Sequence, residues 1–135
     1  MSTRRRGREV VLKALYAFEQ GEQSQSTILE AVMRDGGLDE KTLGFARTLF
    51  EQVANHIKEI DEYIENLATN WKIDRIAIVD KNILRMAIGE IRYMPDIPLK
   101  VAINEAVELA KKYSTFESAA FVNGILDRVI HEKGK

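Results

Sequence analysis

Apolar side chains recur at helical spacing over the first third of the chain and predict two helices. The first covers residues 4–20, because only Gly7 interrupts this range and Gly21 follows it. Its apolar face is formed by residues at i, i+3, i+4 and i+7, namely Val11, Ala14, Leu15 and Phe18. A shorter helix is predicted after Ser26, and the turn signal Asp35-Gly36-Gly37 ends it.

The most regular stretch lies between residues 43 and 67. Its apolar residues are separated alternately by three and four positions: Leu43, Ala46, Phe50, Val53, Ile57, Ile60, Ile64 and Leu67. This spacing is compatible with one long helix or with two helices that meet near His56. It also permits a coiled-coil seam, and through it a homodimer, but a kinked pair of helices inside a small bundle is favoured.

Three further helices are predicted in the second half of the chain. An almost continuously apolar segment at residues 76–91 indicates a buried helix, which ends before Pro95 because proline cannot continue it. The next helix follows Pro98, and the last one follows Ser114 or Thr115, either of which can cap it. No alternating pattern suggests strands. We therefore expect an all-α fold, a single domain over residues 1–135 built as a compact bundle of about seven helices.

The composition excludes several function classes. The chain has 135 residues, of which 45% are hydrophobic and 30% charged, which is typical of one globular domain. The absence of cysteine excludes disulfides, thiolate zinc sites and a cysteine nucleophile. No glycine-rich phosphate loop, nucleophile elbow or paired Glu-x-x-His metal motif occurs, and His56 and His131 lie far apart. We therefore expect no catalytic residues, no metal and no cofactor.

Targeting signals are also missing from the sequence. It contains no run of 18 apolar residues, and the arginines near its amino end are not followed by the apolar stretch of a secretory signal. We therefore expect a cytoplasmic protein with no membrane partner.

Basic residues are concentrated at the amino end. Residues 1–13 contain one acidic residue and five basic ones: Arg4, Arg5, Arg6, Arg8 and Lys13. Cations are unfavourable at a helix N-terminus, which already carries a partial positive charge, so this cluster is expected to have an anionic partner. RNA is a suitable anionic partner, because arginine forms forked hydrogen bonds with phosphate and stacks on bases. We predict that the four arginines form an open RNA-binding arm, whose few phosphate contacts require a second protein or further contacts for tight binding.

Charged residues interrupt the buried segment at residues 76–91. Arg85 and Glu90 are too far apart for an i,i+4 pair, so each needs a partner on another helix if it is buried. Intramolecular ion pairs are the favoured interpretation, and contact of Asp80 or Arg85 with a protein partner is the alternative. Trp71 and Phe116 are candidate platforms for stacking of bases, although core packing is favoured for Trp71.

Four segments of the sequence match motifs that occur together, in this order, in one bacterial family. They are Arg4–Glu9 followed by Ala14-Leu15-Tyr16, Asn82–Ala87 followed by Glu90, Val101–Ala110, and Phe121–Asp127. On these motifs the chain resembles the NusB family of bacterial transcription antitermination factors. The resemblance extends from residue 4 to about residue 130, and its closing motifs are more specific than the arginine cluster.

The resemblance implies two packed subdomains, with three N-terminal and four C-terminal helices. It also implies binding of boxA RNA in ribosomal RNA leaders, association with the small-subunit ribosomal protein NusE, and entry into the antitermination complex of RNA polymerase. The arginine cluster would then contact RNA, with Glu117 and Phe121 as weaker RNA-side candidates. Tyr16 and Asp80 would face NusE, and Arg85 is a further candidate for partner contact.

Two other functions compete with an RNA-binding adaptor. The stronger is a helical protein–protein interaction module without direct RNA binding, in which the arginine cluster is incidental. The weaker is a metal-dependent or hydrolytic enzyme, whose machinery would have to consist of lysine, tyrosine and carboxylate side chains.

Overall fold

The structure, a computed structural model, describes residues 3–21, 23–35, 37–68 and 71–133, and these form helices without any strand. The predicted all-α fold is therefore confirmed. Its elements are α1 (Thr3–Gln20), α2 (Gln25–Asp35), α3 (Glu40–Asn55), α4 (Ile57–Leu67), the short 3-10 helix η1 (Ile73–Arg75), α5 (Ile78–Tyr93), α6 (Leu99–Tyr113) and α7 (Phe116–Lys133).

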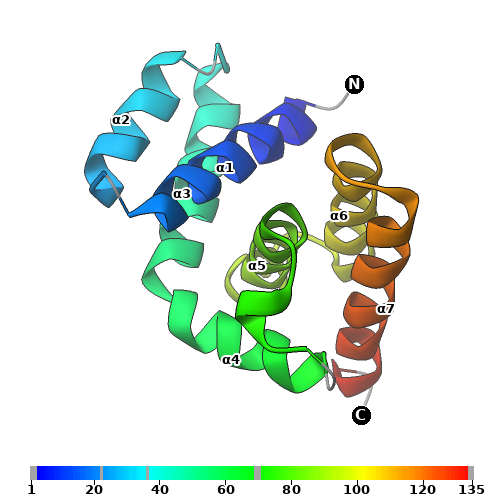
Figure 1. The fold of residues 1–135 in the computed structure, drawn as a ribbon. Coiled ribbons are helices and arrows are strands. Elements are labelled where there is room, and N and C mark those ends of the chain that lie inside the picture. The colour runs from blue at the N-terminus through cyan, green and yellow to red at the C-terminus, as the bar shows by residue number, and fades with distance from the viewer. Residues whose placement is uncertain (1–2, 22, 36, 69–70, 134–135) are drawn as a thin grey trace.

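The helices form two groups, and α5 of the second group also contacts α1 and α3 of the first. Figure 1 shows α1, α2 and α3 packed together at one end of the molecule, and α4, α6 and α7 arranged around α5. Helix α1 packs against both α3 and α5, and α6 packs against both α5 and α7. This arrangement matches the three-helix and four-helix subdomains that the family resemblance implies.

Helix α5 lies at the centre of the core. Every residue from 82 to 91 is buried, which confirms the predicted buried helix. The helix ends at Tyr93, two residues before Pro95, and its last turn is closed by a hydrogen bond from the Met94 N–H to the Glu90 carbonyl. A helix buried on all sides must satisfy its charged residues inside the protein.

The regular stretch at residues 43–67 consists of two helices, α3 and α4, that meet at His56. The His56 ring stacks on Tyr93 with centroids 4.0 Å apart, and its Nδ1 lies 2.8 Å from the Gln52 carbonyl oxygen. Most residues of the apolar seam are buried inside the chain: Ala46, Phe50, Val53, Ile60, Ile64 and Leu67. The kinked pair is confirmed, and most of the seam packs inside the chain.

Side-chain caps explain where two helices begin. The Thr115 Oγ1 accepts a hydrogen bond of 3.0 Å from the Ser118 N–H, so Thr115 is the cap of α7. The Ser24 Oγ accepts one of 3.2 Å from the Thr27 N–H, and α2 begins at Gln25 rather than after Ser26 as predicted. Helix α1 is followed by Gly21 at φ +73°, a conformation that glycine adopts without strain.

Helices α3 and α5 approach each other most closely at Gly89. A Cβ atom added at this position would lie 2.5 Å from Cγ2 of Val53, far inside van der Waals contact. The neighbouring side chains are buried and cannot move away, because protein interiors are close-packed. Glycine is therefore required at position 89 for the close approach.

Gly89→Ala should lower the free energy of unfolding by about 1–3 kcal/mol through overpacking against Val53. Gly124→Ala is a matched control, because a Cβ there meets no atom within 4 Å and an exposed helical alanine should stabilise by up to about 1 kcal/mol. Urea denaturation of both variants measures the difference. A Gly89→Ala protein as stable as Gly124→Ala would show that the packing of α3 on α5 is looser than described.

Candidate nucleic-acid and partner interface

The arginines of α1 do not form the open arm that the sequence predicted. The Arg8 side chain is only 2% exposed, and its Nε and Nη2 donate hydrogen bonds of 2.9 and 2.7 Å to the two carboxylate oxygens of Glu90. Its Nη1 donates one of 3.3 Å to Glu105. The prediction that Arg8 contacts RNA is wrong for this structure, because its guanidinium is covered and its donors face two carboxylates of the chain itself.

The other three arginines remain at the surface to different degrees. Arg5 donates hydrogen bonds of 3.2 and 2.5 Å to Glu105, and its side chain is 37% exposed. The Arg4 guanidinium lies 5.0 Å from the centre of the Phe45 ring, and Arg6 is exposed. We call Arg4, Arg5 and Arg6 the arginine edge of α1. This edge is the part of the predicted arm that an anion can still reach.

The two carboxylates that face Arg8 have opposite pKa shifts. Burial raises the pKa of Glu90, and the charge and hydrogen bonds of Arg8 act against this effect. The pKa of Glu105 is lowered by the hydrogen bond from Arg5, although partial burial acts against it. Glu90 is thus held by a single buried guanidinium, whereas Glu105 is shared between Arg5 and Arg8 and links the buried pair to the surface.

Arg85 forms a second buried ion-pair cluster. The side chain is 7% exposed, and it donates hydrogen bonds of 2.7 and 2.8 Å to Asp61 of α4 and one of 2.8 Å to Glu19 of α1. Its Nη1 also donates to the Asn82 side-chain oxygen at 2.9 Å. The prediction of intramolecular ion pairs for Arg85 and Glu90 is confirmed. The alternative that Arg85 contacts a protein partner is wrong, because the same donors are engaged inside the chain.

Tyr16, a candidate for partner contact, lies at a hollow of about 190 Å³ between α1, α5 and α6. The side chain is 47% exposed, and the walls of the hollow include Leu12, Val79 and Tyr113. At the rim of the hollow, Glu9 links α1 to α6. Its Oε2 accepts hydrogen bonds from the Tyr113 hydroxyl at 2.9 Å and the Lys112 ammonium at 2.5 Å. We call this the Tyr16 hollow.

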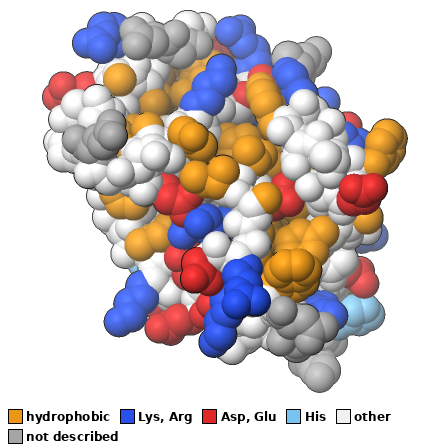
Figure 2. Space-filling view, viewed as in Figure 1, with side chains coloured by type: hydrophobic (Ala, Val, Ile, Leu, Met, Phe, Trp, Pro, Cys, Tyr) orange, Lys and Arg blue, Asp and Glu red, His pale blue; other side chains and the backbone are white. Residues whose placement is uncertain are grey.

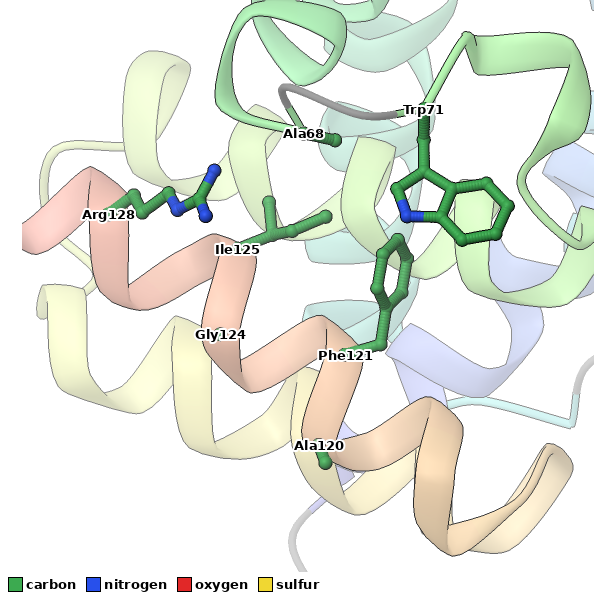
Figure 3. Close-up of a pocket in the computed structure, with 7 residues that line it drawn as sticks. All are labelled: Ala68, Trp71, Ala120, Phe121, Gly124, Ile125 and Arg128. Carbon is green, nitrogen blue, oxygen red and sulfur yellow. The ribbon is translucent and has the colours of Figure 1, made fainter.

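A second hollow, of about 380 Å³, lies beside Trp71 and is called here the Trp71 hollow. Trp71 is 50% exposed, so the expectation of core packing for this residue is wrong. Its ring faces Phe121 of α7 edge to face, with centroids 6.3 Å apart and planes at 76° (Figure 3). Figure 2 shows hydrophobic side chains at the surface between α5 and α7. The remaining lining residues are Arg75, Ile76, Ala77, Asp80, Thr115, Glu117 and Ser118.

The Trp71 hollow brings together residues that the resemblance assigned to different partners. Glu117 and Phe121, the weaker RNA-side candidates, line it together with Asp80, the candidate for NusE contact. Asp80 is 5% exposed and is not among the residues of the Tyr16 hollow. Asp80 therefore lies at the Trp71 hollow and away from the Tyr16 hollow.

Sequence reasoning missed Trp71 as a surface residue. Its position does carry a signal, because it follows the end of the apolar seam at Leu67 and belongs to none of the predicted apolar faces. Phe116, the other candidate platform, is 85% exposed at the start of α7.

The described residues contain no group of three or more histidine, cysteine or acidic side chains that could hold a metal ion. His131 is an exposed residue whose Nε2 lies 3.5 Å from Asp127. Among the described helices, none has the length and apolar character needed to cross a bilayer.

Comparisons with known proteins agree on one family. The model of the NusB family matches residues 5–131. The chain is 47% identical to the transcription antitermination protein NusB of Myxococcus xanthus, over 96% of this chain and 95% of that protein. The structure of NusB from T. maritima is similar with a TM-score of 0.89 and 38% identity, covering 98% of this chain and 93% of the other. A chain in a crystal structure of antitermination factors NusB and NusE in complex with dsRNA is similar with a TM-score of 0.86 and 25% identity. The match covers 96% of this chain and 96% of the other.

Arg8→Met should lower the free energy of unfolding by about 3–5 kcal/mol, because it leaves the Glu90 charge buried without its partner. The double variant Arg8→Met with Glu90→Leu removes both charges and should recover most of this loss. Arg6→Met, at an exposed position of the same helix, is the matched control and should change stability by no more than about 0.5 kcal/mol. Equal destabilisation by Arg8→Met and Arg6→Met in urea denaturation would contradict the assignment of a buried pair.

Proposed function

Because the chain belongs to the NusB family, we propose that it is a non-enzymatic adaptor in transcription antitermination. In this role it binds boxA RNA of ribosomal RNA leaders together with the ribosomal protein NusE and helps RNA polymerase to pass terminators. It needs no cofactor for this work, and its place is the cytoplasm, where the transcript is made.

The observation that carries the proposal is the family match over residues 5–131 combined with the arginine edge at the start of α1. Arg6 is exposed and Arg4 and Arg5 are partly so, on a chain whose remaining charge is predominantly acidic. The N-terminus of a helix adds backbone N–H groups and a partial positive charge, both favourable to phosphate. The similar chain that occurs with NusE and dsRNA supports the same pair of partners for this protein.

The Tyr16 hollow is the proposed contact surface for NusE. An aromatic residue that is partly exposed beside an apolar hollow is a common anchor in protein–protein interfaces. Lys13 and Glu9 at its rim supply polar groups around the apolar centre, as interfaces usually have. Arg6 and Tyr16 are separated by about 15 Å along α1, so one helix can contact RNA near its start and NusE near its end.

Arg6→Ala should weaken binding of a boxA oligonucleotide and reduce the slope of log affinity against log salt by about 0.7, the value for one phosphate contact with single-stranded RNA. Fluorescence anisotropy with labelled RNA and NusE present, over a range of salt concentrations, measures both quantities. Lys58→Ala removes one exposed positive charge from α4 and is the matched control, which should leave the slope unchanged. An identical salt slope for wild type and Arg6→Ala would exclude Arg6 as a phosphate contact.

The ion pairs of Arg5 and Arg8 favour one alternative, a protein–protein interaction module without direct RNA binding. These two arginines are already engaged by Glu105 and Glu90, so fewer cations are available for RNA than the sequence indicated. Size-exclusion chromatography of the chain with NusE, with and without boxA RNA, separates the two functions. An adaptor that binds RNA elutes earlier when RNA is added, whereas a pure protein-binding module is indifferent to it.

A further inference from the structure

We propose that Asn82 is a specificity-determining contact for the protein partner, and that its side-chain nitrogen at the Tyr16 hollow donates a hydrogen bond to a main-chain carbonyl of NusE. The inference rests on the proposed function, which assigns this hollow to NusE, and it adds the chemical group that the hollow recognises. It concerns a different part of the molecule from the arginine edge, which is the proposed contact for RNA.

The orientation of the Asn82 side chain follows from its contact with Arg85. The Arg85 Nη1 donates a hydrogen bond of 2.9 Å to the Asn82 Oδ1. A guanidinium has donors but no acceptor, so the oxygen of the amide must face Arg85 and the nitrogen must point the other way. Arg85 is itself held by Asp61 at 2.7 Å and by Glu19 at 2.8 Å. The ion-pair cluster therefore fixes which end of the amide is left for another partner.

The Nδ2 atom of Asn82 is a buried donor without an acceptor. The side chain is 1% exposed, and no described residue accepts a hydrogen bond from Nδ2. Buried donors are almost always paired, because an unpaired one has lost its hydrogen bonds to water without replacement. Asn82 also lines the Tyr16 hollow, so an acceptor can arrive from there. The Tyr16 ring is half exposed and can turn aside when a partner inserts, as interface side chains commonly do.

The walls of the hollow favour a neutral acceptor. They include Leu12, Val79 and Tyr113, which would remove the hydration of a carboxylate or a phosphate without replacing it. At the rim, Glu9 carries a negative charge that opposes an anion, and Lys13 offsets part of this repulsion. A main-chain carbonyl is a neutral acceptor, and the single donor of Asn82 is enough to satisfy it. This chemistry favours a segment of protein over the backbone of RNA.

The size of the hollow suits one side chain of a protein partner. Its volume of about 190 Å³ is smaller than the range of about 300–1,000 Å³ that is typical of small-molecule sites. An apolar side chain of the partner can fill it while a neighbouring carbonyl meets Asn82, with Tyr16 as the aromatic anchor. A similar chain occurs together with NusE in a solved structure, which supports a segment of NusE as the occupant.

Asn82→Asp keeps the size of the side chain and the contact with Arg85 but replaces the donor with a second acceptor. It should weaken binding of NusE about tenfold or more, because two acceptors would then face each other. Asn82→Ala removes the amide and should weaken binding about fivefold. Asn55→Asp is the matched control that should bind like wild type, because Asn55 is exposed, lies outside the hollow and likewise accepts a hydrogen bond, from Gln25 at 3.4 Å.

Isothermal titration calorimetry with purified NusE measures these affinities, and urea denaturation shows whether each variant is folded. The side-chain amide signals of Asn82 in ¹H–¹⁵N spectra give a direct readout of the hydrogen bond, and their loss in Asn82→Ala identifies them. Their protons should shift downfield when NusE is added to the wild-type chain, and should not respond to boxA RNA alone.

The outcomes separate this inference from the proposed function. Unchanged NusE affinity in folded Asn82→Asp would overturn the inference and leave the proposed function standing. If that variant lost stability but kept its NusE affinity, Nδ2 would be assigned to Glu19, whose Oε2 also lacks a partner, and the inference would again be overturned. A response of the Asn82 signals to RNA alone would assign the hollow to RNA instead. Absence of NusE binding by the wild-type chain would overturn both the inference and the NusE part of the proposed function.

Discussion

The buried ion pair between Arg8 and Glu90 fixes the position of α1, on which the candidate surfaces depend. Arg8 makes two hydrogen bonds to Glu90 of α5 and one to Glu105 of α6, so α1 is joined to both helices near its start. Near its other end, Glu19 of α1 contacts Arg85 of α5 and Lys81 at 2.5 Å. A buried guanidinium and carboxylate have few alternative partners, and geometry rather than net stability is what such pairs most clearly contribute.

This fixed position has a consequence for function. Because α1 cannot roll on its neighbours without breaking buried hydrogen bonds, the arginine edge and the Tyr16 hollow keep a constant separation and orientation. An adaptor that binds RNA with one end of a helix and a protein with the other gains from such rigidity, since little conformational freedom is lost on binding. Glu105 couples the interior to the surface, because it accepts hydrogen bonds from both Arg8 and Arg5.

Helical periodicity predicted most of the fold, and it failed where contacts are remote in sequence. The kink at His56, the end of α5 before Pro95 and the Thr115 cap follow from local rules, and each is present. The sequence contains a local signal for the burial of Arg8, although the charge of this residue suggested a surface position. Arg8 precedes Val11 and Leu15 by three and seven residues and thus lies on the same apolar face. Its partner Glu90, however, lies 82 residues away, and no spacing rule connects the two.

The candidate site was predictable to a smaller extent for the same reason. Helical spacing places Tyr16 at the margin of an apolar face, but only the family resemblance suggests it as a contact for a partner. The meeting of Trp71 with Asp80, Glu117 and Phe121 depends on how α7 packs beside the start of α5, which is tertiary structure that the sequence pattern does not specify.

We infer that Arg8 acts inside the protein and propose that the arginine edge acts on RNA. The most direct test is the affinity of the folded double variant, Arg8→Met with Glu90→Leu, for a boxA oligonucleotide in the presence of NusE. We expect an affinity within about twofold of wild type, because the two apolar replacements keep α1 packed on α5 and the arginine edge is unchanged. A loss as large as that caused by Arg6→Ala would contradict it and would return Arg8 to the RNA-binding surface.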